Sequence, residues 1–188
     1  MTRPEPSFQE HLEKQRDRIV GKWLDAAIRT YPEDTAKFLK HQGDEFANPV
    51  GATLSRELEN IFLELQKEQS SENLAQYVDA IVRVRAVQDF SPSRALRIFT
   101  VLKDVLRAEL DYTVRQQGWQ SEYRALEDKV DQLCMLAFDI YVRCREKVWE
   151  IRAREMQNRA GYLLRKFAGA EFDTPADSEP RSGSKEEG

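Results

Sequence analysis

The feature that most constrains the fold is residues 121–167, a long stretch of helix-forming residues without a proline. Apolar residues recur along it at alternating steps of three and four, which is the spacing of one helix face. At 1.5 Å per residue, one helix of this length would measure about 70 Å, roughly twice what a small domain can cover. We therefore expect part of it either to bend back or to leave the domain and meet a partner. The stripe consists of Val130, Leu133, Ala137, Ile140, Cys144, Val148 and Ile151, continued by Met156, Ala160, Leu163 and Phe167.

The segments before this stretch also show helical periodicity. Expected helices cover residues 8–31 and 33–42, a third begins at Pro49, a fourth covers about 70–89, and a fifth runs from Pro92 to Gly118. The inward faces of the first three are expected to include Trp23, then Phe38 and Leu39, then Leu58 and Phe62. Proline in the first helical turn and glycine just past the last turn are typical helix boundaries. No segment alternates with period two, so the sequence predicts an all-α bundle of about six helices, with a long C-terminal helix over about residues 121–168. We expect residues 1–170 to form one helical domain, and the polar, breaker-rich residues 171–188 to be a disordered tail.

Composition sets limits on the class of protein. With 188 residues, the chain suits one domain with a substantial core, and its 33% charged residues suit long, exposed helices. The formal net charge of −4 argues against nucleic acid as the main partner. No apolar run approaches the length that a transmembrane segment requires, and the N-terminus does not resemble a signal peptide. Cys134 and Cys144 would lie about 15 Å apart on one helix, beyond bridging distance, so we expect free thiols in a reducing cytoplasm.

The sequence offers little material for catalysis or for a bound cofactor. It contains two histidines, His11 and His41, and no pair of histidines or cysteines has the spacing of metal ligands. No nucleophile motif and no phosphate-binding glycine loop occurs. We therefore predict no enzyme activity, no metal and no cofactor. We expect His11 to be solvated, and a haem-based gas sensor that uses His41 as ligand is an open alternative.

Basic residues are concentrated near the end of the long helical stretch. This run could form a patch for an acidic partner, for anionic lipid or for RNA. The simpler interpretation is a solvated helix face, on which acidic residues one turn away balance part of the charge. The run comprises Arg143, Arg145, Lys147, Arg152, Arg154, Arg159, Arg165 and Lys166.

Two groups of motifs go beyond helical periodicity. The first consists of residues 18–24 (RIVGKWL), Tyr31-Pro32, Phe38-Leu39 and residues 44–51 (DEFANPVG). The second is residues 84–96 (VRAVQDFSPSRAL), with the core Arg-x-x-Gln-Asp-Phe-Ser-Pro. Together they resemble the N-terminal domain of the RsbRD-type RsbT co-antagonist proteins, over about residues 8–141.

The resemblance implies a globin-like sensor domain that carries no haem and pairs with a second copy. In that family, the domain usually precedes a STAS domain, through which the protein joins stressosomes and is phosphorylated by the kinase RsbT. Here a continued helix follows instead, so we expect a stand-alone input module without a STAS domain. The continued helix lies where relatives connect to an output domain. Its interface candidates are Val148, Trp149, Ile151, Met156 and Leu163.

The main hypothesis is a cytoplasmic, homodimeric regulatory protein. It would sense a signal or bind a partner through its helical domain, and would transmit the signal to a target protein by direct contact. A small-molecule signal is compatible with this hypothesis. An alternative is an accessory protein of a larger, membrane-associated redox complex, docked through the basic helix. The residues to test first for binding are Asp44, Asn48, Arg85, Asp89 and Phe90. Their structural roles would be helix caps for Asn48 and Asp89, and an ion pair of Arg85 with one of the two aspartates.

Overall fold

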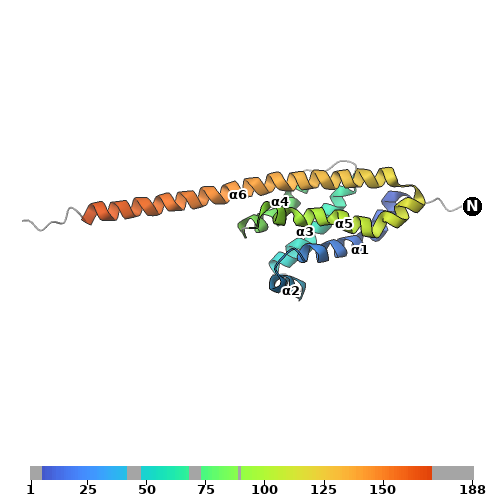
Figure 1. Ribbon diagram of the computed structural model, residues 1–188, viewed down its shortest axis with the longest axis horizontal. Coiled ribbons are helices and arrows are strands. Elements are labelled where there is room, and N and C mark those ends of the chain that lie inside the picture. The colour runs from blue at the N-terminus through green and yellow to red at the C-terminus, as the bar shows by residue number, and fades with distance from the viewer. Residues whose placement is uncertain (1–5, 42–47, 68–72, 89, 171–188) are drawn as a thin grey trace, which may run out of the picture. The chain divides into compact units, whose positions relative to one another are not determined.

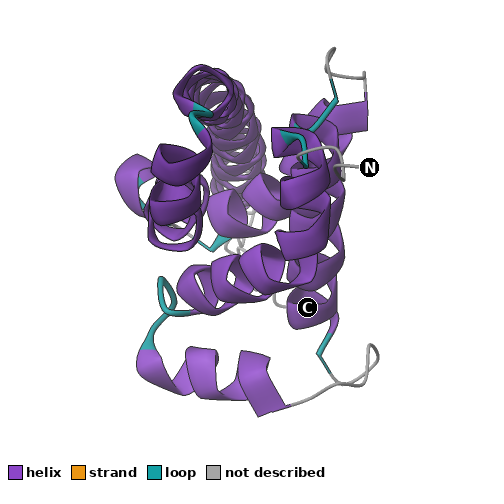
Figure 2. Cartoon of the chain, turned by 90° about the vertical axis from the view of Figure 1, so that its right-hand side faces the viewer, coloured by secondary structure: helices purple, strands orange, loops and turns teal. Residues whose placement is uncertain are grey.

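A computed structural model describes residues 6–41, 48–67, 73–88 and 90–170 of the chain. In these residues the backbone forms six helices joined by short connections (Figure 1, Figure 2). The all-α prediction is therefore confirmed. The helices are α1 (Phe8–Ile28), α2 (Glu33–His41), α3 (Pro49–Leu65), α4 (Asn73–Val87), α5 (Pro92–Gln117) and α6 (Gln120–Ala170).

The chain divides into two compact units, Met1–Val148 and Trp149–Gly188, and the boundary falls within α6. The first unit contains α1 to α5 and the first part of α6. The second unit contains the rest of α6 from Trp149 onward. The expected single domain over residues 1–170 stays a prediction, and the expected disordered tail lies outside the described residues.

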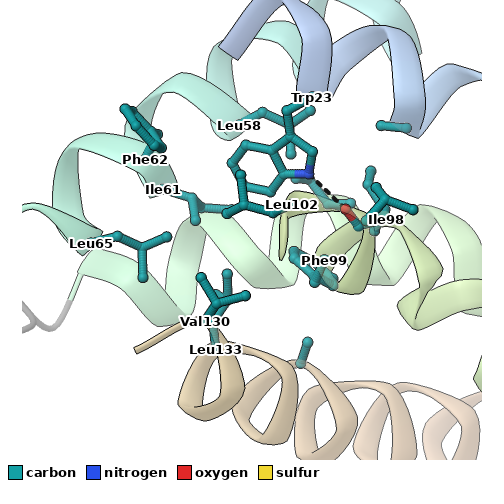
Figure 3. Close-up of a cluster of buried hydrophobic side chains, with 14 of the residues drawn as sticks. Trp23, Leu58, Ile61, Phe62, Leu65, Ile98, Phe99, Leu102, Val130 and Leu133 are labelled. Atoms are coloured by element: carbon teal, nitrogen blue, oxygen red, sulfur yellow. Dashed lines mark hydrogen bonds between the residues drawn. The ribbon is translucent and has the colours of Figure 1, made fainter. Parts of the chain in front are cut away.

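The core of the first unit is formed by side chains from several helices at once. Trp23 is completely buried, and its indole Nε1 donates a 2.7 Å hydrogen bond to the carbonyl of Ile98 on α5 (Figure 3). Because the indole N–H has a hydrogen-bond partner, burial of the ring stabilises the fold without the cost of an unpaired polar group. The same buried cluster contains Leu58, Ile61, Phe62 and Leu65 of α3, Phe99 and Leu102 of α5, and, on its other side, Val130 and Leu133 of α6.

Several helix boundaries follow from local chemistry. Ser7 and Glu10 form a capping box at the start of α1. Gly118 ends α5 with φ of 75°, a conformation that a side chain would strain. Asn48 caps α3, as expected, by accepting a 2.9 Å hydrogen bond from the N–H of Gly51. Pro92 opens α5 as predicted, but the Ser91 side chain makes no capping hydrogen bond.

The structure corrects three sequence-based expectations about packing. Phe38 of α2 is 49% exposed, so of the two residues expected to pack inward only Leu39 is buried. The α1 helix ends at Ile28, before the expected Tyr31, although Tyr31 is itself buried. His11 is half-buried rather than solvated, because its ring lies 5.6 Å from that of Trp119. Burial is the main cause that lowers the pKa of His11, and the nearby charge of Lys14 adds to it.

The apolar stripe of α6 is buried only along its first part. Val130, Leu133, Ala137 and Ile140 are buried, whereas Cys144 and Val148 are half-buried. Ile151, Met156, Leu163 and Phe167 are exposed, each by 50% or more. One helix therefore provides a core face in the first unit and an exposed apolar face in the second.

Candidate functional site

Arg85 is the centre of the candidate site, because it is a completely buried arginine. It lies near the C-terminal end of α4 and donates from Nη1 to the backbone carbonyls of Arg94 (3.0 Å) and Ala95 (3.3 Å). Its Nη2 donates to the hydroxyl oxygen of Thr30 at 2.6 Å. One guanidinium thus connects α4, the start of α5 and the turn after α1.

Aromatic rings cover the same guanidinium. Its Cζ atom lies 4.4 Å from the ring centroid of Tyr31 and 5.2 Å from that of Phe90. The two rings meet edge to face, with centroids 5.5 Å apart. Arg94 lies 4.7 Å from the ring centroid of Phe90, so Phe90 contacts two guanidinium groups. Cation–π attraction strengthens when the cation is withdrawn from water, as it is at Arg85.

Burial sets the electrostatics of Arg85. Among the described residues, Arg85 forms no ion pair with a carboxylate, and its buried Nε lacks a hydrogen-bond partner. Loss of hydration is the main cause that lowers the pKa of Arg85, while the nearby Tyr31 acts in the opposite direction. Arginine still keeps its proton, because its pKa starts far above neutral pH. The first unit therefore encloses a positive charge that is held by carbonyl dipoles and π faces.

The connection between α4 and α5 also contacts α6. The Tyr141 hydroxyl donates to the carbonyl of Phe90, and Nη1 of Arg145 donates to the carbonyl of Ala86 at 3.1 Å. Both contacts lie within the first unit. Tyr141 and Arg145 therefore join α6 to the connection that carries Phe90, next to Arg85.

The predicted site residues are only partly brought together. Arg85 and Phe90 are in contact, as expected for one site. Asn48 is buried elsewhere, where its side chain donates to the carbonyl of Leu39 at 2.9 Å and joins α2 to α3. A Cβ atom at Gly51 would lie 2.3 Å from Asn48 Nδ2, so this junction requires the glycine. Asp44 and Asp89, with the proposed ion pairs to Arg85, lie outside the described residues.

Sequence reasoning missed three residues of the site, Thr30, Tyr31 and Tyr141. Tyr31-Pro32 was noticed as part of a motif, but nothing in the sequence indicated that its ring faces Arg85. Thr30 and Tyr141 lie 55 and 56 positions from Arg85 along the chain, and no local pattern marks them.

A second candidate surface lies in the second unit. Trp149, Met156 and Leu163 are exposed and follow one another at intervals of seven residues. Ala153, Ala160 and Phe167 complete steps of four and three, which is the a/d spacing of a coiled coil. We call these six residues the seam. Of the interface candidates, Val148 and Ile151 lie outside the seam by this spacing, because on a helix they point well away from Trp149.

Basic residues border the seam along one side. Arg152, Arg159 and Lys166 also follow at intervals of seven, each three residues after a large seam residue. The Arg152 guanidinium lies 5.8 Å from the ring centroid of Trp149, so the row contacts the seam directly. Within this unit, three residues of the basic run therefore border the apolar face and are themselves exposed to solvent.

Metal-ligand residue types do not gather at one place in the part of the chain that the structure describes. No group of three or more His, Cys, Asp or Glu side chains in that part of the chain could hold a metal ion. His41 closes α2, but its side chain is not described, so its expected use as a haem ligand stays a prediction. In the same described residues, no helix is long and apolar enough to cross a membrane.

The sequence profile of the RsbT co-antagonist protein RsbRD N-terminal domain matches residues 17–156. The chain belongs to this family. The resemblance seen in the sequence motifs is thereby confirmed, and the family is one of regulatory input domains rather than of enzymes. The matched region includes the Arg85 site and the first part of the seam.

An uncharacterized protein of Archaeoglobus fulgidus is also similar to the chain. The two are 26% identical over 147 residues, which cover 76% of this chain and 85% of the archaeal protein. No solved structure matches the chain significantly.

The two thiols are expected to react slowly in the folded protein. Burial is the main cause that raises the pKa of both Cys134 and Cys144, so little thiolate forms at neutral pH. Iodoacetamide labelling at pH 7.5, followed by mass spectrometry, should modify Cys134 at least tenfold more slowly in native protein than in urea-unfolded protein. Equal rates in the two states would show that Cys134 is accessible and not held in the core.

Proposed function

We propose that this protein is a cytoplasmic, non-enzymatic regulatory module that senses a signal in its first unit and acts by protein contact through the seam. Its family supports the regulatory part of this proposal. The contact part rests on one observation, the exposed apolar residues at coiled-coil spacing in the second unit. A second helix that covers this apolar face would remove a large apolar area from water, and this burial would stabilise the complex.

A second copy of the same segment is the first partner that we propose. In a parallel pair, each large seam residue meets its own counterpart, and Ala153 and Ala160 let the two helices approach closely. Arg152, Arg159 and Lys166 of one helix then lie beside the residues on the other side of the partner helix's seam. Those residues are Glu150, Gln157 and Leu164. An antiparallel pair would bring the basic rows against each other, which like-charge repulsion disfavours.

The contact between the α4–α5 connection and α6 supports a route from the first unit to this surface. Tyr141 and Arg145 precede the seam by less than three turns of the same helix. We propose that a change around Arg85 alters how these side chains hold α6, and that the altered pairing of the seam is what a regulatory target protein recognises.

Sedimentation velocity at micromolar concentration tests the pairing. We expect the wild-type chain to be a dimer. The variant Met156→Asp with Leu163→Asp should be monomeric, with a dissociation constant raised by about 100-fold or more, because two carboxylates would be buried without partners. Circular dichroism should show that the first unit keeps its helices and its melting temperature.

The matched control places the same charges outside the seam. Ile151→Asp with Tyr162→Asp changes two residues that are also exposed and apolar, yet lie on other faces of the helix. This variant should remain dimeric. If both double variants lose the dimer equally, the seam does not define the interface, and a monomeric wild-type protein would contradict the homodimer itself.

A further inference from the structure

A groove between α1 and α5 combines an apolar strip with a set of charged side chains. Its volume is about 700 Å³, and its lining belongs entirely to the first unit. The apolar part of the lining comes from Ala26 of α1 and from Val101, Val105 and Ala108 of α5. Pockets that bind small molecules commonly combine such an apolar part with a few polar groups that fix orientation.

The carboxylates of the groove are already engaged by cations. Asp25 lies 3.0 Å from Nζ of Lys40, and Asp104 lies 3.9 Å from Arg107. Glu109, although its side chain is only 4% exposed, receives Arg18 at 2.6 Å and Lys22 as well. These acidic groups therefore have little capacity left to attract a cationic ligand.

Two arginines of the groove, unlike its carboxylates, lack an oppositely charged partner among the described residues. These two are Arg29 and Arg97. The contacts show that they share one end of the groove. Lys22, in the second half of α1, pairs with Glu109 in the second half of α5. Thr30, just after α1, contacts the same Arg85 guanidinium as the carbonyls of Arg94 and Ala95 at the start of α5. The α1 and α5 helices therefore run antiparallel along the groove. Arg29 and Arg97 thus lie at the Thr30 end, near the buried charge of Arg85.

We propose that this groove binds an amphipathic anion, with its carboxylate or phosphate head at Arg29 and Arg97 and its apolar body along α5. Guanidinium groups bind such heads through paired, charge-assisted hydrogen bonds. The floor from Val101 to Ala108 receives the body of the ligand. The proposal rests on the proposed sensory function, for which it supplies the class of signal.

The position of Thr30 explains why this groove suits a sensor. Thr30 lines the groove and accepts the hydrogen bond of Arg85. Its hydroxyl also donates to the carbonyl of Ala27 at 2.6 Å. An anion beside Thr30 competes for this hydroxyl and attracts the Arg85 guanidinium, whose other contacts hold the start of α5 and Phe90. Occupancy of the groove is thereby coupled to the α4–α5 connection.

Isothermal titration calorimetry of the full chain tests the proposal, with octanoate and octyl phosphate as the probes. At least one of them should bind with one saturable site, and comparing the two identifies the preferred head group. Acetate and n-octanol, which carry only the head or only the body, should bind at least tenfold more weakly. Equal binding of octanol would show an apolar site without anion recognition, and would overturn the proposal.

Variants locate the site on the chain. Arg29→Ala and Arg97→Ala should each weaken binding by about tenfold, since each removes a hydrogen-bonded charge. Ala108→Trp should abolish binding by filling the floor of the groove. Arg115→Ala is the matched control, because Arg115 is an exposed arginine of α5 outside the groove. Unchanged affinity in Arg29→Ala and Arg97→Ala, or no saturable binding to the wild type, would refute the site.

The test of ligand binding in the groove and the test of dimerisation through the seam can succeed or fail separately. Sedimentation of the groove variants without ligand should give the same dimer as the wild type. A protein that dimerises but binds neither probe would retain the proposed protein contact and lose this ligand class. A protein that binds octanoate as a monomer would retain the groove and contradict the proposed dimer.

Discussion

Replacing Arg85 with alanine is expected to lower the free energy of unfolding of the first unit by about 3–5 kcal/mol, the cost of truncating a large, fully buried side chain. The guanidinium fills the space between Tyr31 and Phe90 and joins three parts of the chain. Its removal leaves a cavity and separates α4 from the turn after α1. Urea denaturation, followed by circular dichroism, measures the loss.

Two further variants separate packing from charge. Arg85→Met keeps most of the volume without the charge, and should recover more than half of the loss, because replacing a buried ionic group by an apolar one is often close to neutral. Arg83→Ala is the matched control. Arg83 lies two residues away on α4, is exposed, and pairs with Asp79 one turn earlier, so its removal should cost about 0.5 kcal/mol or less.

The role of Arg85 in signalling has its own readout. If Arg85 couples the groove to α6, the Arg85→Met variant should still bind octanoate. Binding should then leave the hydrogen-exchange rate of the α6 backbone near Tyr141 unchanged in this variant. In wild-type protein, binding should change that rate. An Arg85→Met variant with a wild-type exchange response would restrict Arg85 to a structural role, and Arg85→Ala with unchanged stability would contradict the packing argument.

Sequence patterns predicted the elements whose causes are local. Asn48 and Gly118 act at helix ends through their own side-chain and backbone chemistry, so short motifs sufficed to place them. The core faces of α1 and α3 followed from the helical spacing of large apolar residues, and Trp23, Leu58 and Phe62 are buried as expected. The family motifs contributed the site around Arg85 and Phe90, but gave no geometry for it.

The failures concern contacts between distant residues. Periodicity placed Phe38 inward, since it cannot tell which of two adjacent apolar residues a neighbouring helix covers. His11 looked solvated because its partner, Trp119, lies 108 positions away. The α6 stripe shows the same limit. Its apolar spacing continues past Val148, but only the packing of the other helices decides where the buried part ends.

Trp23→Ala should be about as damaging as Arg85→Ala, with a loss of about 3–5 kcal/mol in the free energy of unfolding. Its indole is completely buried among α3 and α5 residues, and donates to the carbonyl of Ile98. Trp23→Phe keeps most of the buried area and loses this hydrogen bond, so it should cost roughly 1–2 kcal/mol. Both values follow from chemical denaturation monitored by circular dichroism.

Trp149→Ala provides the comparison, because the same residue type is 58% exposed in the second unit. It should leave the unfolding of the first unit unchanged within about 0.5 kcal/mol, while weakening the dimer in sedimentation. The two tryptophans therefore separate the two kinds of apolar surface in this chain: Trp23 stabilises a fold, and Trp149 is available to a partner. If Trp149→Ala destabilises the first unit as strongly as Trp23→Ala, the α6 segment after Val148 belongs to the core, and the seam cannot serve as the contact surface.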